Sequence, residues 1–234
     1  AALVAAALAA VVAASPALAA DDAGAAAAVV AKYSANPTSI GNLARIGRPI
    51  PRGKRLVTIA IDANVGHQLN HYTAQAGRLL GWKVEPVWVD DTLEAQREAL
   101  QQAIATSPDG IAVSGMDTSD YGDLYAQAAK KGIAIVCSAC MSKPGNGLLD
   151  THIAGAQMLN LWGRMIAAYT ASTVKGVPHV QMFGTSVYPI LIQFDKAYEA
   201  SLKRFSPSAT TTFNEFDLAG DIPTQVTKVY AAHP

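Results

Sequence analysis

The sequence has few charged residues and no excess of either sign. Lysine plus arginine and aspartate plus glutamate each number 18 among 234 residues, and charged residues make up 15% of the chain. Proteins that bind DNA or RNA neutralise phosphates with a surplus of basic side chains. The even balance therefore argues against nucleic acid as a partner.

Sequence signatures of catalysis and nucleotide binding are also missing. The chain has no Gly-x-Ser-x-Gly elbow, no phosphate loop and no dinucleotide fingerprint. Its paired carboxylates, Asp21-Asp22 and Asp90-Asp91, are adjacent in sequence, and neighbours on a strand point to opposite faces. We therefore expect neither an enzyme nor a cofactor, and keep a hydrolase or redox protein only as an alternative.

No apolar run is long enough for a transmembrane helix. The run Ala1–Ala14 is dominated by alanine and is shorter than the roughly 20 residues that cross a membrane. Ser15 and Pro16 end it, and the Ala-x-Ala stretch Ala17–Ala19 follows, which is typical of an export-signal cleavage site. We expect residues 1–19 to be an export signal truncated at its start. The mature protein is then extracytoplasmic, in the periplasm or at the cell exterior.

The chain has only two cysteines, Cys137 and Cys140. In an exported protein a disulfide is the first expectation for such a pair. Full extension would place the two Cα atoms roughly 10 Å apart, whereas a disulfide tolerates at most about 7 Å. The bond therefore requires a turn at Ser138 and Ala139. Two buried thiols that behave as small apolar residues are the alternative.

Residues 55–140 repeat a short apolar run followed by an amphipathic segment of helical period. The runs are apolar nearly throughout, as in parallel strands that are covered on both faces. Their spacing fits a strand, a crossover helix and two short loops, so the pattern predicts an open α/β sheet. The predicted strands are Leu56–Ile61, Val84–Val89, Gly110–Ser114 and Ile133–Cys137. The helix after the first of these strands is expected to bury Leu69, Tyr72, Ala76, Leu79 and Leu80.

A second set of strand and helix units follows a domain boundary that we place within residues 153–178. We predict strands at His179–Phe183 and Thr210–Phe216, with helices at Gln157–Ser172, Ile190–Phe205 and Ile222–His233. Four segments result: the signal 1–19, an Ala/Pro-rich arm 20–54, an N-terminal α/β lobe 55–153, and a crossover with a partial C-terminal α/β lobe 154–234. Within the arm we expect a short helix around Ala25–Tyr33, followed by an irregular stretch that lies on the surface.

Polar residues follow the predicted strands of the first lobe. Ligands of open α/β sheets bind outside the carboxyl ends of the strands, so we expect these side chains to line a cleft. For Asn64 and His67 a ligand role is favoured, whereas Asp91 and Asp117 either bind ligand or cap the helices that follow them. His67 and His71 have metal-ligand spacing, but no third ligand is evident and no metal is expected. The polar candidates are Asp62, Asn64, His67, Asp91, Asp117 and Gln157.

Several local runs occur in a fixed order along the chain. They are Leu80-Gly81-Trp82, Ser107-Pro108-Asp109-Gly110-Ile111, Lys131-Gly132-Ile133-Ala134, His152-Ile153-Ala154, Gly184-Thr185-Ser186 and Ala231-Ala232-His233-Pro234. In this order the chain from about residue 55 onward resembles the type 1 periplasmic binding proteins, most closely the ribose- and galactose-receptor branch. The resemblance implies a two-lobed α/β fold of parallel sheets flanked by helices. It also implies a monomeric receptor that hands a small polar molecule, such as a sugar, to the membrane permease of an ABC importer.

The positions that bind sugar in that family match less well than the scaffold does. The aromatic residues that follow the first strand in the family are absent from Asp62–His67. Ser138 begins the loop after the fourth predicted strand and is a further candidate by its place there. Matching by position, the resemblance implies further ligand contacts at Cys140, Gln157, Tyr188 and Phe216, of which only Phe216 keeps the family's residue type. The resemblance therefore implies the fold of the family but does not imply that the ligand is a sugar. The sensory input of a signalling receptor, which binds without transport, is a further alternative.

The resemblance calls for a further strand and its ligand-bearing loop after Pro234. A second lobe without them would leave an apolar sheet edge open. We therefore expect the sequence to be a piece of a longer receptor, with its second lobe incomplete.

Overall fold

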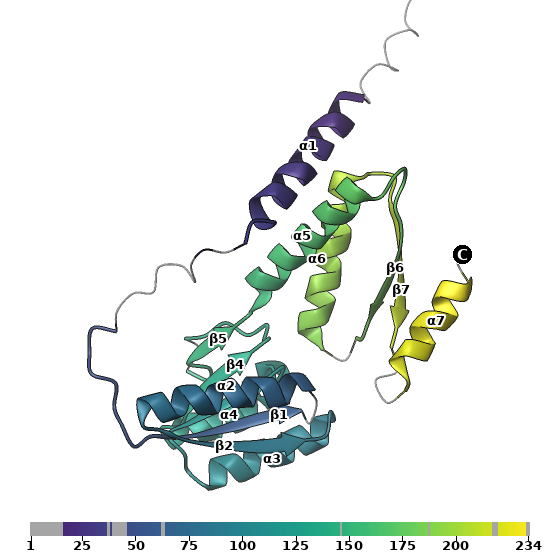
Figure 1. Cartoon of the computed structure of the whole chain (residues 1–234). Coiled ribbons are helices and arrows are strands. Elements are labelled where there is room, and N and C mark those ends of the chain that lie inside the picture. Colours follow the sequence, from purple (N-terminus) through teal and green to yellow (C-terminus); the bar gives the residue numbers. More distant parts are fainter. Residues whose placement is uncertain are drawn as a thin grey trace, which may run out of the picture. The chain divides into compact units, whose positions relative to one another are not determined.

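The computed structural model describes residues 16–36, 38, 46–61, 64–145, 147–186, 188–216 and 220–232. It divides the chain into two compact units, which Figure 1 shows with their elements labelled. Unit 1 comprises Ala1–Ser39 and Met158–Pro234, and unit 2 comprises Ile40–Gln157. The N-terminal segment thus belongs with the C-terminal part of the chain.

Unit 2 is built on a parallel sheet with the strand order β2-β1-β3-β4-β5. The order reverses between β1 and β3, and such a switch point is where doubly wound α/β sheets bind their ligands. This architecture confirms the predicted α/β class. The strands are β1 Arg55–Ile61, β2 Lys83–Val89, β3 Gly110–Ser114, β4 Ala134–Ser138 and β5 Thr151–Ile153. The helices are α2 Asn64–Leu80, α3 Leu93–Ala105 and α4 Thr118–Lys130.

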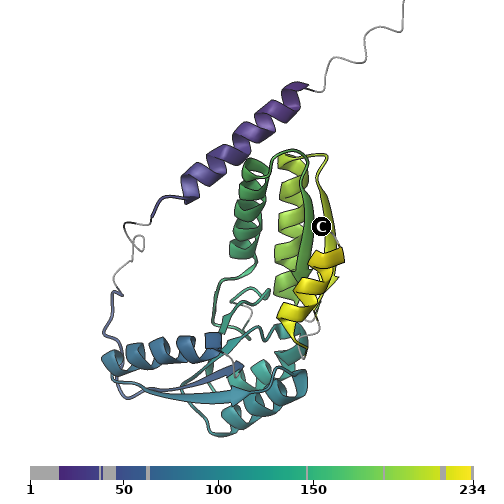
Figure 2. The ribbon, with the colours of Figure 1, turned by 45° about the vertical axis from the view of Figure 1, so that its right-hand side comes forward.

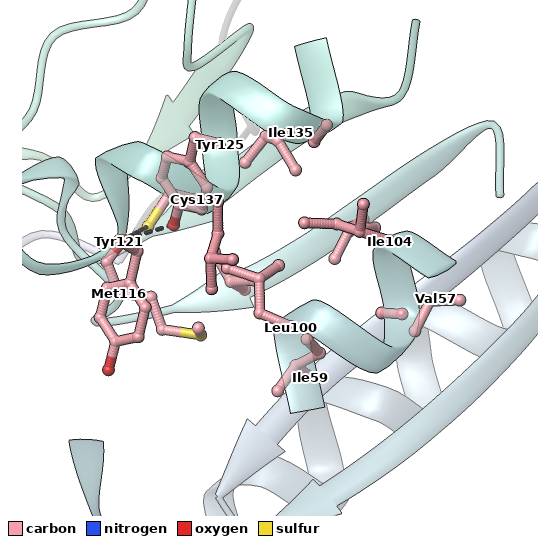
Figure 3. Close-up of a cluster of buried hydrophobic side chains, with 14 of the residues drawn as sticks. Val57, Ile59, Leu100, Ile104, Met116, Tyr121, Tyr125, Ile135 and Cys137 are labelled. Atoms are coloured by element: carbon pink, nitrogen blue, oxygen red, sulfur yellow. Dashed lines mark hydrogen bonds between the residues drawn. The ribbon is translucent and has the colours of Figure 1, made fainter. Parts of the chain in front are cut away.

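The core of unit 2 lies between the sheet and helices α3 and α4. Alternate residues of the strands point to this side, because side chains in a strand alternate between its two faces. Leu100, Ile111 and Tyr125 have no exposed surface, and Figure 3 shows helix and strand residues converging on one cluster. The cluster includes Val57, Ile59, Leu100, Ile104, Ile111, Leu124, Tyr125 and Ile135.

Helix α2 packs against the sheet with a different side from the one expected. Leu69, Tyr72 and Leu79 are 53%, 66% and 84% exposed, so the prediction that they are buried is wrong. The side that faces the sheet carries Gly77, where an added Cβ would lie 2.4 Å from Cγ2 of Val84. Only a residue without a side chain permits this approach, so the glycine side turns inward and the large apolar side chains turn out.

Unit 1 has a two-stranded parallel sheet in the part that the structure describes, formed by β6 His179–Gly184 and β7 Thr210–Glu215. Its helices are α1 Pro16–Tyr33, α5 Ala156–Thr173, α6 Pro189–Phe205 and α7 Ile222–Ala232. Figures 1 and 2 show α5 and α6 running side by side along this sheet. The core comprises Ala26, Val29, Ala167, Ala168, Met182, Tyr198, Leu202, Phe205 and Ala209.

Helix α1 contributes Ala26 and Val29 to that core. The predicted helix Ala25–Tyr33 ends at the observed residue but begins earlier, at Pro16. The burial of Ala26 and Val29 is hard to predict from the sequence, because an alanine-rich helix has only a weak apolar stripe. Both core residues follow the predicted cleavage site at Ala19, so cleavage there would leave them in the mature chain.

We expect Ala26→Glu to destabilise unit 1. The change would place a carboxylate at a position that is 1% exposed. Helix α1 can detach from the core and return the carboxylate to water. We therefore expect the free energy of unfolding to fall by only about 1–2 kcal/mol. Thermal unfolding with hydrogen exchange over α5 and α6 would measure it. Ala28→Glu, on the exposed side of the same helix, is the matched control, and equal effects of the two changes would contradict the packing of α1.

The apolar run of the predicted export signal lies outside the described residues, which begin at Pro16. Within the described part of the chain, no helix combines the length and apolar character needed to cross a membrane. The export signal stays a prediction.

Candidate functional site

The carboxyl ends of the strands in unit 2 carry most of the predicted site residues. Asp62 lies outside the described residues, and Asn64 begins helix α2 shortly after it. His67 is exposed in the first turns of the same helix. Asp91 and Asp117 follow β2 and β3, so the structure brings the predicted loops to one edge of a single sheet.

Asp91 does not cap helix α3. The cap is Thr92, whose side chain accepts a hydrogen bond of 3.2 Å from the backbone N–H of Ala95. The carboxylate of Asp91 instead accepts a 3.3 Å hydrogen bond from the side-chain amide of Gln96, whose oxygen accepts a 2.6 Å bond from the Tyr121 hydroxyl. Burial raises the pKa of Asp91 above its usual range, and burial likewise raises the pKa of Tyr121 to about 12. Tyr121 thus stays a hydrogen-bond donor at neutral pH, and the Asp91 loop is anchored to α4.

Asp117 holds two loops together. It occupies the position before helix α4, but its side chain makes no capping hydrogen bond. The carboxylate accepts hydrogen bonds from the backbone N–H of Met141 at 2.5 Å and of Ser142 at 3.2 Å, and also from the Ser142 hydroxyl. With 7% of its surface exposed, Asp117 is occupied in joining the loop after β3 to the loop after β4. The capping role considered from the sequence is therefore wrong for the Asp117 side chain, and a contact with ligand stays a prediction.

The chain turns directly after β4 and joins the two cysteines. Ala139 has a φ of 55°, and the Cα atoms of Cys137 and Cys140 lie 6.0 Å apart with their sulfurs bonded. Both cysteines have no exposed surface, so Cys140 offers no atom to a ligand here. Ser138 is half-buried, and its hydroxyl donates a hydrogen bond of 3.4 Å to the carbonyl oxygen of Val113.

An aromatic pair stands at the carboxyl end of β2. The rings of His67 and Trp88 lie with their centroids 4.0 Å apart and their planes tilted by 37°. Trp88 is 37% exposed and was not among the predicted site residues, because its sequence context is that of an apolar strand. Its position at the end of a predicted strand, shortly before the pair Asp90-Asp91, could have identified it as a site residue.

A hollow of about 320 Å³ lies between the carboxyl end of edge strand β2 and helix α3. This volume is in the range of small-molecule sites, and polar groups stand among apolar ones as such sites require. Its polar side chains are Asp90, Glu98 and Gln102, and its remaining residues are Val87, Trp88, Val89, Ala95 and Ala99.

The predicted site residues in the C-terminal part of the chain lie at strand ends and at helix starts. Gln157 is exposed in the first turn of α5, and Tyr188 is half-buried directly before α6. Phe216 follows β7 and stacks on Phe183 at a centroid distance of 5.4 Å. The predicted contacts are thus divided between the two units, with Gln157 as the last residue of unit 2.

Beside Phe216, Glu215 ties the loop after β6 to the end of β7. Its carboxylate accepts a hydrogen bond from the Ser186 hydroxyl and one of 3.0 Å from the Ser186 backbone N–H. These bonds lower the pKa of Glu215 below its usual range, and the bond from the Ser186 hydroxyl has the larger effect.

The described part of the chain holds no cluster of three or more histidine, cysteine or acidic residues that could bind a metal ion. Of the two histidines with metal-ligand spacing, His71 shares a hydrogen bond of 2.9 Å with Gln75. His67 contacts the Trp88 ring.

Several proteins of known structure share this fold. GanP, a glucose-galactose binding protein from Geobacillus stearothermophilus, is 15% identical with a TM-score of 0.66 over 79% of this chain and 66% of that one. A solute-binding protein of an ABC transporter from Agrobacterium vitis, bound with alpha-D-tagatopyranose, is 21% identical with a TM-score of 0.62 over 77% and 64%. The fructose-binding periplasmic domain of a hybrid two-component system is 17% identical with a TM-score of 0.66 over 78% and 61%.

No protein-family model and no curated protein matches the sequence. The structural likeness confirms the predicted fold of the type 1 periplasmic binding proteins. At these identities it establishes the fold alone. The chain spans 60–66% of the length of the solved structures it matches, so part of their fold has no counterpart in this sequence.

Proposed function

We propose that this chain is the ligand-binding part of an extracytoplasmic receptor that captures a small sugar or polyol for an ABC importer. The observation that carries the proposal is the doubly wound sheet of unit 2, whose carboxyl edge gathers polar and aromatic side chains at a switch point. Structures with this fold include proteins bound with D-arabinose, alpha-D-tagatopyranose and allitol. A small hydroxyl-rich molecule is the ligand class common to them.

The ligand is proposed to lie over the ends of β1, β2 and β3. Asn64 and His67 would approach it from the first turns of α2, where backbone N–H groups also point outward. Trp88 would offer an apolar ring face to the carbon skeleton of a sugar, and Asp91 would accept hydrogen bonds from its hydroxyls. Asp117 and Ser138 would position the neighbouring loops. For Gln157, Tyr188 and Phe216, a ligand contact stays a prediction from the sequence.

A sensory receptor is the second candidate. The fructose-binding periplasmic domain of a hybrid two-component system has the same fold as this chain, with a TM-score of 0.66. A sensory receptor of this kind would bind its ligand without transporting it. Permease and ATPase genes beside the gene of this protein would favour import, and a kinase gene would favour sensing.

A thermal-shift screen of sugars, polyols, amino acids and aromatic acids tests the proposed ligand class. A ligand at one hundred times its dissociation constant stabilises the folded state by about 2.7 kcal/mol. We expect a pentose, hexose or polyol to raise the unfolding temperature, with the affinity then measured by calorimetry. A shift with an amino acid or aromatic acid and none with any sugar or polyol would contradict the proposal.

A further inference from the structure

Two loops at the carboxyl edge of unit 2 are joined by buried groups that the proposed ligand contacts do not use. The Asp117 carboxylate, in the loop after β3, accepts hydrogen bonds from the backbone N–H groups of Met141 and Ser142, in the loop after β4. The Tyr125 hydroxyl fixes the residue before Asp117 through a hydrogen bond of 2.5 Å to the carbonyl oxygen of Met116. Met116 and Tyr125 are fully or almost fully buried, so this arrangement belongs to the core as well as to the loops.

The disulfide holds the same loop from its other end. Cys140 directly precedes Met141, and the bond to Cys137 ties it to the end of β4. The backbone N–H of Ala139, between the cysteines, donates a hydrogen bond of 2.8 Å to the carbonyl oxygen of Ile153. A covalent bond and a buried carboxylate therefore act on consecutive residues, 140 to 142.

We propose that the Cys137–Cys140 disulfide and Asp117 form a clamp that oxidation closes and that burial then shields from reductants. When the clamp closes, two thiols lose two electrons and two protons, one sulfur–sulfur bond forms, and a disulfide oxidant such as glutathione disulfide is reduced to two thiols. Thiol–disulfide exchange requires a thiolate to reach a sulfur, and neither sulfur has exposed surface in the folded unit. The bond must therefore form while the loop is still open.

The redox state of the cell compartment decides whether the clamp is open or closed. Thiols stay reduced in the cytoplasm and form disulfides in oxidising compartments. A chain that is exported, as the sequence predicts, would cross the membrane with its loops unclamped and close them on arrival. This inference does not depend on the identity of the ligand, or on whether the proposed ligand binds at all.

Reduction kinetics test the shielding. Oxidised protein is treated with dithiothreitol, whose dithiol becomes a cyclic disulfide, and free thiols are alkylated and counted by mass spectrometry over time. We expect reduction of the native protein to be at least tenfold slower than reduction of the same protein in guanidinium chloride. Equal rates would overturn the shielding, and two alkylated thiols in protein that is denatured without a reductant would overturn the clamp itself.

Hydrogen exchange at the amides of Met141 and Ser142 tests the coupling. The samples are the wild type, the double variant Cys137→Ala with Cys140→Ala, the variant Asp117→Asn, and the triple variant. We expect the double cysteine variant and Asp117→Asn each to speed exchange at these amides at least tenfold. Exchange in the triple variant should be little faster than in either of them. Asp120→Asn changes an exposed carboxylate in the first turn of α4, three residues after Asp117, and is the control that should change nothing.

Two outcomes of the exchange experiment would reject the clamp. One is unchanged exchange of Met141 and Ser142 in the double cysteine variant, which would show that the disulfide does not hold the loop. The other is a triple variant whose effect is the product of the two separate effects, which would show that the disulfide and Asp117 act independently. Reduction kinetics of the wild type still apply if a variant fails to fold.

Discussion

Gly163→Ala is expected to destabilise unit 1 even though alanine is the better helix former. Gly163 lies in the middle of α5, and a Cβ added there would meet the backbone nitrogen of Tyr198 at 2.8 Å and the carbonyl oxygen of Phe194 at 2.9 Å. These are backbone atoms of α6, so they can give way only if the two helices separate. Overpacking of this kind costs about 1–3 kcal/mol, and we expect the upper end because a backbone has to move.

Gly122→Ala is the matched control for this prediction. Gly122 also lies within a helix, α4, but an added Cβ would meet nothing within 4 Å. Here only helix propensity counts, and alanine should stabilise unit 2 by about 1 kcal/mol. Chemical denaturation monitored by hydrogen exchange in each unit would measure both changes. Stabilisation by both would show that α5 and α6 do not approach each other as closely as the structure has them.

The pattern of apolar runs was sufficient to predict the strands and most helices. The third strand, Gly110–Ser114, has the predicted bounds, and the strands and helices after residue 150 agree within a few residues. Buried parallel strands are apolar on both faces, so a short apolar run between two amphipathic segments indicates such a strand. The order of the units then limits the topology, because crossovers between parallel strands are right-handed.

Helix α2 shows why side-chain burial was harder to predict than helix position. Its apolar residues have helical spacing, which normally identifies the buried side. At Gly77, however, the helix backbone approaches β2 so closely that no side chain fits, and this contact decides which side faces inward. A glycine within a helix indicates close approach only when the neighbouring strand is known. The sequence alone does not supply that neighbour.

The site was predicted by position better than by role. Loop residues after β2 and β3 do gather at one sheet edge, because parallel strands place their carboxyl ends together. Neither Asp91 nor Asp117 caps the following helix with its side chain, and a ligand contact of either stays a prediction. The partner of Asp91, Gln96, is close in sequence, whereas Asp117 accepts hydrogen bonds from Met141 and Ser142 in the loop after β4. The partners of Asp117 follow from the register of the strands and the turn at Ala139, not from local spacing.

Trp88→Leu is expected to weaken binding of the cognate ligand roughly 30-fold, which corresponds to about 2 kcal/mol. Trp88 is an exposed aromatic ring at the carboxyl edge of unit 2, and the tilted ring of His67 contacts it with a centroid distance of 4.0 Å. Leucine keeps the apolar character of the strand but removes the flat face on which the carbon skeleton of a sugar would pack. His67→Ala, which removes the partner ring and leaves the indole, should have a smaller effect in the same direction.

Trp162→Leu is the control, because Trp162 lies on α5 and is 45% exposed there. Calorimetry gives the affinity, and tryptophan fluorescence gives a second, local signal. If the ligand packs on Trp88, it should change the emission of the wild type and of Trp162→Leu but not of Trp88→Leu. A ligand that binds the wild type and Trp88→Leu equally well would place the sugar elsewhere on the edge. The polar loops at β1 and β3 would then have to carry recognition without an aromatic surface.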